Sequence, residues 1–202
     1  MAKFGPSATP NKYLNVSASL VGRVEELAEL EQILANSLAG QPQFVWLEGA
    51  TGSGKSRLAA ALAERARRQG GRVCWGCGDS TQQTVSYFPW QQIVADLLDL
   101  AEEQPAAVSH QEWLAARIAR LETTIAALNP NWLIRLPLLG DLLGWSIPDN
   151  ATTAAFEPHL RQDALFGLVA DLLQTLTQKQ PLLLLLDDCQ WLMKLLRPCC
   201  CR

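Results

Sequence analysis

A glycine-rich octapeptide, Gly49-Ala-Thr-Gly-Ser-Gly-Lys-Ser56, is the segment whose residue types and spacing point most directly to chemistry. It matches the pattern G-x-x-x-x-G-K-[ST], in which the glycines let successive backbone N–H groups turn inward around one phosphate. A predicted helix follows at once, and the partial positive charge of its N-terminus favours an anion there. We therefore expect Lys55 to reach the β- and γ-phosphates of a nucleotide and the Ser56 hydroxyl to ligate Mg²⁺. The candidate nucleotide-binding residues of this loop are Gly49, Ala50, Thr51, Gly52, Ser53, Gly54, Lys55, Ser56 and Arg57.

Two acids follow an apolar run near the other end of the chain. Leu182–Leu186 is predicted to be a strand buried on both faces, because such a strand need not alternate apolar and polar residues. Asp187 and Asp188 then emerge at its carboxyl end, where ligands bind in open α/β sheets. We expect Asp187 to hold Mg²⁺ through water and Asp188 to orient and polarise an attacking water, which makes Lys55 and Asp188 the candidate catalytic residues.

The choice of base can be narrowed from the sequence. Proteins that select guanine carry an Asn-Lys-x-Asp element, and here Asn11-Lys12 is followed by Tyr13-Leu14 and precedes the glycine-rich loop. This segment does not match, so adenine is favoured and the expected ligands are ATP and Mg²⁺.

The predicted elements place both motifs on a parallel sheet. Apolar residues recur at helical spacing from Leu27 to Leu38. Residues 44–48 are predicted to be a strand, the stripe Leu58–Ala66 a helix, and Arg72–Trp75 a second strand, which together form one right-handed βαβ unit. With Leu182–Asp187 as the third strand, the fold class is α/β: a P-loop NTPase whose parallel sheet is flanked by helices.

A large helical insertion, at about residues 89–178, is predicted between the second and third strands. It contains helices at Pro89–Leu100, at Ser109–Leu128 behind a Ser109/Glu112 capping box, and from Pro158 onward. Residues 130–156 are punctuated by proline and glycine and carry only short apolar pieces.

Composition and charge exclude several other classes of protein. The chain has 202 residues, of which 49% are hydrophobic and 18% charged, so global disorder is excluded. A net charge of −3 offers no basic surface for direct nucleic-acid binding. The longest aliphatic run, Leu182–Leu186, is far shorter than the roughly 20 residues of a membrane span, and the first twenty residues hold no signal-peptide core. We expect a cytoplasmic protein.

A family resemblance rests on four motifs together: Leu20-Val-Gly-Arg23, the glycine-rich loop, Tyr87-Phe-Pro-Trp90 and Asp187-Asp-Cys-Gln-Trp191. From Leu20 to Trp191 the chain resembles the AAA-type ATPase module of bacterial STAND-class signal-transduction NTPases, which is similar to origin-recognition ATPases. The resemblance implies that Val21 and Gly22 lie near the adenine. It also implies a regulatory ATPase that works with protein partners or effector domains. On sequence alone, Val21–Arg23 is only the approach to a helix.

The chain also departs from that family. The family continues into a strand with a polar sensor residue, an arginine finger and a helical lid, whereas this sequence ends eleven residues after Trp191. We therefore expect an incomplete sheet, with either a central gap or direct pairing of the glycine-loop strand with the acid strand. The predicted organisation is a flexible arm (1–19), the N-terminal part of the ATPase domain (20–191) and an atypical tail (192–202). Hydrolysis is expected to be weak or absent. The alternative is a non-hydrolysing nucleotide-binding remnant whose helical middle serves as a protein-interaction surface.

The cysteines leave alternatives open. Cys74-Trp-Gly-Cys77 is a C-x-x-C, which is compatible with a redox pair or half of a zinc site. In a strand, however, residues i and i+3 face opposite ways, which favours two buried apolar thiols. The consecutive Cys199–Cys201 could be acylated, but an accidental tail is the favoured interpretation, and their placement argues for a reducing compartment.

Overall fold

The computed structural model describes residues 22–78, 87–100 and 105–189. The arm at 1–19, Val21 and the tail at 192–202 lie outside these residues, so the expectations placed on them stay predictions. The described elements, in chain order, are α2 (Val24–Leu38), α3 (Lys55–Arg68), β1 (Arg72–Cys77), α4 (Phe88–Leu97), α5 (His110–Leu128), the 3₁₀ helix η1 (Pro130–Arg135), α6 (Leu136–Leu143), α7 (Ala151–Ala154), α8 (Pro158–Thr177) and β2 (Leu182–Asp187).

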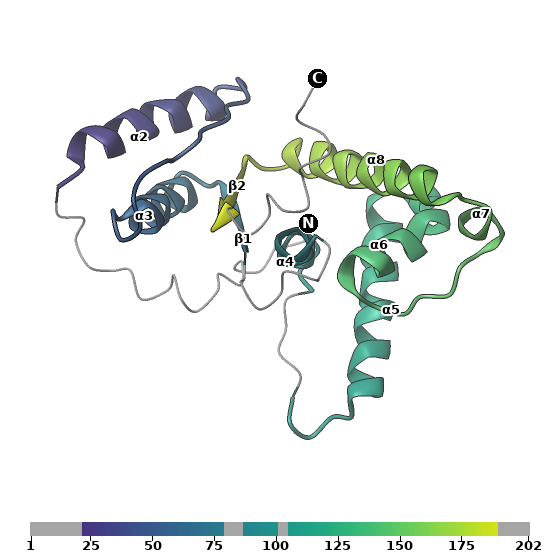
Figure 1. The fold of residues 1–202 in the computed structure, drawn as a ribbon. Coiled ribbons are helices and arrows are strands. Elements are labelled where there is room, and N and C mark those ends of the chain that lie inside the picture. The colour runs from purple at the N-terminus through teal and green to yellow at the C-terminus, as the bar shows by residue number, and fades with distance from the viewer. Residues whose placement is uncertain (1–21, 79–86, 101–104, 190–202) are drawn as a thin grey trace.

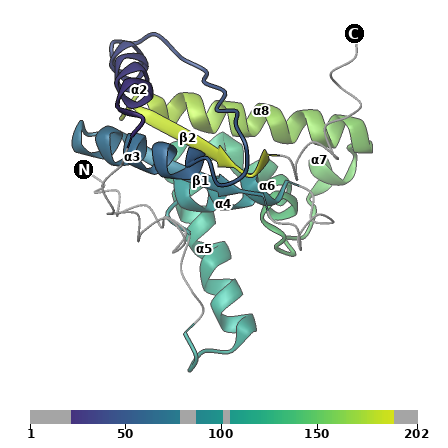
Figure 2. The same ribbon diagram turned by 60° about the vertical axis from the view of Figure 1, so that its left-hand side comes forward.

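The sheet of the described residues consists of β1 and β2, which pair in parallel with Arg72 opposite Leu182 and Cys77 opposite Asp187. Alternate side chains enter different cores. Trp75 and Leu183 pack with α2 and α3, whereas Cys74 and Leu184 pack with α4 and α8. Helices therefore cover both faces, α2 and α3 on one side and α4 and α8 on the other (Figures 1 and 2). A parallel sheet flanked by helices was predicted, and the described sheet is parallel, with the helical insertion lying between its two strands in the sequence.

The predicted strand at residues 44–48 is wrong. This segment has no regular structure, and its side chains are exposed, Phe44 by 86% and Trp46 by 60%. A strand is stabilised by a hydrogen-bonded neighbour, and none of the described residues forms a ladder with this segment. The βαβ unit expected over 44–75 is consequently absent. Of the two alternatives for the sheet, the structure contradicts direct pairing of the glycine-loop segment with the acid strand.

The acid strand is also less buried than its sequence predicts. The residues of β2 are half-buried, and Leu186 is 41% exposed. An apolar run indicates a strand that can be buried on both faces. It does not indicate whether a further strand covers its second edge, and among the described residues only β1 pairs with β2.

The helical insertion is built around its own core. Residues from α4, α5, α6 and α8 form one buried cluster that includes Ile125, Leu139 and Leu168. The predicted capping box of α5 is present, with the Ser109 hydroxyl accepting from the Glu112 amide. Three short helices within 130–156 were not predicted. Pro130 and Pro137 stand in the first turns of η1 and α6, where a proline starts a helix rather than ending one.

None of the described helices is both long enough and apolar enough to cross a membrane.

The close packing of α4 against β1 gives a first testable prediction. A Cβ on Gly76 would lie 2.6 Å from the Pro89 carbonyl oxygen, whereas a Cβ on Gly167, in α8, meets nothing within 4 Å. We expect Gly76→Ala to lower the free energy of unfolding by about 1–3 kcal/mol. Gly167→Ala, at an exposed position inside α8, should raise it by about 0.8–1 kcal/mol. Urea denaturation of both variants checks this, and equal effects would contradict the packing of α4 on β1.

Candidate functional site

The glycine-rich loop is closed by its own backbone. The Ser53 amide donates to the Ala50 carbonyl over 3.1 Å, and Gly52 and Gly54 adopt positive φ angles of 78° and 90°, which a side chain would strain. A Cβ on Gly49 would lie 3.0 Å from Ser53 Oγ. These glycines therefore let the loop fold tightly against the start of α3.

Lys55 is the first residue of α3, and its side chain folds back over the loop. Its Nζ donates to the carbonyl oxygens of Gly49 (2.8 Å) and Ala50 (3.1 Å). Ser56, the next residue, is half-buried in the same turn. The structure thus brings an ammonium group and a hydroxyl to the mouth of the loop, as the sequence predicts.

Two further features fit a phosphate group at this loop. Gly54 is the N-cap of α3 and supplies no side-chain cap, and the first turn carries no acid, so the helix N-terminus keeps its partial positive charge. The Ser53 hydroxyl is buried and has no hydrogen-bond partner among the described residues. A buried hydroxyl without a partner is costly, and a phosphate oxygen would satisfy it.

Arg23 is a second cation beside the loop, and no role was predicted for it. Its Nε lies 4.0 Å from where a Cβ on Gly54 would stand, and its guanidinium is 3.6 Å from Glu26. The neighbouring Gly22, which was expected near the adenine, is exposed with a φ of 74°. Its position in the Val-Gly-Arg motif is the sequence feature from which a role for Arg23 at the loop could have been predicted.

The two acids stand at the carboxyl end of β2, as predicted. Asp187 ends the strand, and its carbonyl accepts from the Gly78 amide over 2.9 Å. This bond continues the pairing of β1 with β2 beyond Cys77 and Asp187. Asp188 has a φ of 55° and donates its amide to Asp187 Oδ1 over 2.9 Å. Figure 2 shows that α3 begins at the end of the sheet toward which the β2 arrow points, so loop and acids share one end of the sheet.

The two cysteines of the C-x-x-C motif differ in surroundings. Cys74 is fully buried, and this burial, more than the nearby Asp96, raises the pKa of its thiol. Cys77 is only half-buried, packs on the opposite face of the sheet, and its Sγ lies 3.8 Å from Asp188 Oδ2. The expectation of two buried apolar thiols is therefore correct for Cys74 and wrong for Cys77, because the end of β1 opens toward the acids.

A third thiol, Cys189, follows the acids directly. It is half-buried, and its Sγ lies 3.4 Å from the Leu186 carbonyl oxygen, to which it donates. Burial, followed by the charges of Asp187 and Asp188, raises the pKa of this thiol.

The metal site expected from the sequence would hold Mg²⁺ directly by the Ser56 hydroxyl and, through water, by the Asp187 carboxylate. No group of three or more His, Cys, Asp or Glu side chains is arranged to hold a metal ion in the described parts of the chain. A hydroxyl and a carboxylate fit Mg²⁺, which is typically held by one or two protein oxygens together with phosphate oxygens and water.

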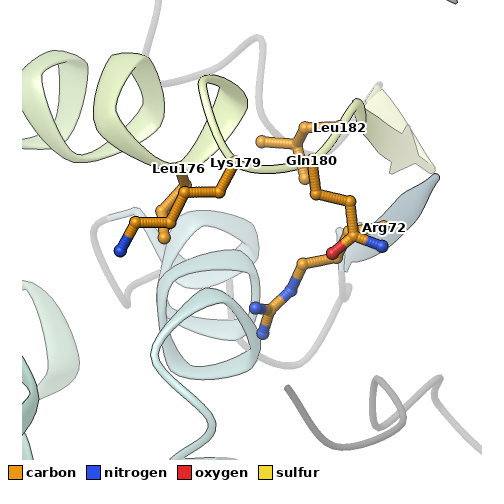
Figure 3. Close-up of a pocket in the computed structure, with 5 residues that line it drawn as sticks. All are labelled: Arg72, Leu176, Lys179, Gln180 and Leu182. Carbon is orange, nitrogen blue, oxygen red and sulfur yellow. The ribbon is translucent and has the colours of Figure 1, made fainter. Parts of the chain in front are cut away.

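A small cavity at the opposite end of the sheet does not contribute to this site. It is lined by Arg72, Leu176, Lys179, Gln180 and Leu182 (Figure 3) and has room for about one water molecule. The Arg72 guanidinium is already engaged by Asp99 Oδ1 at 2.9 Å and by the Asp96 carbonyl.

A glycine-rich loop that opens a helix, with acids at the same end of a parallel sheet, defines the P-loop class of α/β proteins. The model of one family, described as "AAA ATPase domain", matches residues 19–195. The chain therefore belongs to the AAA ATPase domain family. Searches of curated proteins and of solved structures find no significant match.

Proposed function

We propose that this chain is a regulatory ATPase module that binds ATP together with Mg²⁺, and that it hydrolyses ATP weakly or not at all by itself. The single observation that carries the proposal is the loop of Gly49–Ser56, in which Lys55 Nζ lies over the loop and the buried Ser53 hydroxyl has no partner among the described residues. Membership of the AAA ATPase domain family supports nucleotide binding.

Each residue of the site has a proposed role. The loop amides and the α3 N-terminus bind the phosphates, and Lys55 exchanges its bonds to the two loop carbonyls for bonds to phosphate oxygens. Ser56 and Asp187 hold Mg²⁺, whose charge offsets that of the phosphates. Asp188 orients an attacking water and accepts its proton. Val21 and Gly22 approach the adenine.

Weak hydrolysis is proposed for the site as described, in which the loop, Ser56 and the two acids have assigned roles and no arginine finger has been assigned. Such a residue contributes roughly 10³–10⁵-fold in rate where it is present. We further propose a STAND-type signalling role in the cytoplasm, with effector domains or protein partners reading the nucleotide state.

A second candidate function is a nucleotide-binding remnant that does not hydrolyse ATP and uses its helical half as a protein-interaction surface. The observation that favours it is the exposure of large apolar side chains there, with Ile134 50%, Leu160 48% and Phe166 48% exposed. Isolated exposed apolar residues are common on protein surfaces, so this candidate ranks second.

Calorimetric titration with ATP and with GTP, each with and without Mg²⁺, tests the proposal. We expect ATP to bind more tightly than GTP and Mg²⁺ to tighten ATP binding in the parent chain but much less in Ser56→Ala. Phosphate release above background, measured on the same samples, would contradict the second candidate function, which has no hydrolysis. Equal affinity for ATP and GTP would contradict the adenine assignment, and no binding of either nucleotide would contradict the proposed function.

A further inference from the structure

A glutamine side chain from α4 closes the outer edge of β1 at the strand's carboxyl end. On the inner edge, the Gly78 amide bonds the Asp187 carbonyl of β2 over 2.9 Å. Because successive residues of a strand direct their N–H and C=O groups to alternate edges, those of Cys77 face away from β2. Gln92 bonds both of them, since its Oε1 accepts from the Cys77 amide and its Nε2 donates to the Cys77 carbonyl, each over 3.2 Å.

The Gln92 amide stands where a neighbouring strand would stand. In the described part of the chain the sheet consists of β1 and β2, so no described strand lies on the outer edge of β1. Cys77 and Gln92 are half-buried and Gly78 is buried, and backbone groups covered by protein need hydrogen-bond partners. A primary amide offers both a donor and an acceptor, whereas a carboxylate only accepts and a thioether offers little of either.

Close packing of α4 on β1 fixes the position of Gln92. A Cβ on Gly76 would lie 2.6 Å from the Pro89 carbonyl oxygen and 3.0 Å from Ile93 Cδ1. Ile93, the residue after Gln92, is fully buried in the same cluster as Cys74. The backbone of α4 therefore has little room to move away from the strand, and the Gln92 amide stays within reach of Cys77.

The strand end that Gln92 holds contacts both acids of the proposed site. Gly78 bonds the backbone of Asp187, and Cys77 Sγ lies 3.8 Å from Asp188 Oδ2. The Asp188 amide in turn donates to Asp187 Oδ1 over 2.9 Å, which ties the carboxylate of Asp187 to the backbone of the turn. A displacement of the end of β1 therefore reaches both carboxylates.

We propose that Gln92 is a positioning residue for the Mg²⁺ site. It is not one of the proposed metal-binding residues, Ser56 and Asp187. It fixes the end of β1, against which the backbone of Asp187 is held, and it joins α4 to the acid end of the sheet through two hydrogen bonds. The effect on the metal rests on the proposed function, whereas the effect on the strand end does not.

Hydrogen exchange, followed by NMR on the full chain without nucleotide, tests the effect on the strand end. Gln92→Met keeps the length of the side chain and removes both bonds to Cys77. We expect the Gly78 amide to exchange about tenfold faster, as is reasonable for the loss of one or two hydrogen bonds. The Arg72 amide, which bonds the Pro181 carbonyl over 2.8 Å at the other end of β1, should keep its exchange rate.

Metal affinity tests the effect on the site. In the complex with ATP, Gln92→Met should lower the affinity for Mn²⁺, measured by electron paramagnetic resonance, by about tenfold, the lower end of the effect of groups around metal ligands. Gln92→Glu should not restore it, because a carboxylate cannot donate to the Cys77 carbonyl. ATP binding in EDTA should stay unchanged in both variants. Gln111→Ala, which removes an exposed glutamine from α5, is the matched control and should behave like the parent chain.

Three results would overturn the proposal. They are an unchanged exchange rate at Gly78, an equal rise at Gly78 and Arg72, which would show that Gln92 supports the whole sheet, and an unchanged Mn²⁺ affinity in a variant whose Gly78 amide exchanges faster. Failure of the parent chain to bind ATP would overturn the proposed function and the metal role with it. The Gly78 result would still stand in that case, because it is obtained without nucleotide, so the two failures are distinguishable.

Discussion

Replacing Lys55 with alanine is expected to weaken ATP binding by about tenfold to a hundredfold, since a hydrogen bond to a charged group contributes about 1.5–3 kcal/mol. The parent side chain already points over the loop, where its Nζ bonds the Gly49 and Ala50 carbonyls. In the complex the ammonium group exchanges these neutral acceptors for anionic phosphate oxygens, so the gain is specific to the bound state. Fluorescence titration with a labelled ATP analogue measures the difference.

Lys179→Ala is the matched control for this experiment. Lys179 is an exposed lysine beside the small cavity at the opposite end of the sheet, so its removal changes the net charge equally without touching the loop (Figure 3). We expect it to bind ATP like the parent chain. If Lys55→Ala and Lys179→Ala bind equally well, the loop is not the phosphate site.

The second large effect is expected at the metal. Asp187→Asn should lower the affinity of the nucleotide complex for Mg²⁺ by about 10- to 100-fold, as is typical when a group that holds a metal through water is changed. The substitution keeps the size of the side chain and its oxygen acceptor for the Asp188 amide, and it removes only the charge. Mn²⁺ titration followed by electron paramagnetic resonance measures the metal affinity directly.

The control for this experiment is Asp163→Asn, which removes one exposed carboxylate from α8 in the helical half. ATP binding in EDTA should be nearly the same in the parent chain and in both variants, because no metal contributes under that condition. A loss of ATP binding in EDTA for Asp187→Asn would instead show that the carboxylate supports the fold of the loop.

The local parts of the site could be predicted because they depend on short-range chemistry. The glycines at positions 52 and 54 take the positive φ values that the loop requires, and the apolar stripe from Leu58 to Ala66 is buried as its spacing predicts. The capping box at Ser109 and the strand that ends in Asp187 are equally local features.

The errors concern features that depend on distant partners. Residues 44–48 have the composition of a strand, but a strand also needs a neighbour, and composition does not reveal one. Cys77 was expected to be a buried thiol because residues i and i+3 of a strand face opposite ways, yet its surroundings depend on where the turn after β2 places Asp188. Arg23 reaches the loop through the left-handed turn that begins α2, which the helical periodicity of that segment does not show.

The central claim is that the loop of Gly49–Ser56 binds the phosphates of ATP. A crystal structure of the chain with a non-hydrolysable ATP analogue and Mg²⁺ tests it most directly. The account predicts that Lys55 Nζ leaves the Gly49 and Ala50 carbonyls and contacts the β- and γ-phosphates, with the metal between Ser56 Oγ and Asp187. Lys55 still bonded to both carbonyls, with the analogue bound elsewhere at saturation, would contradict it.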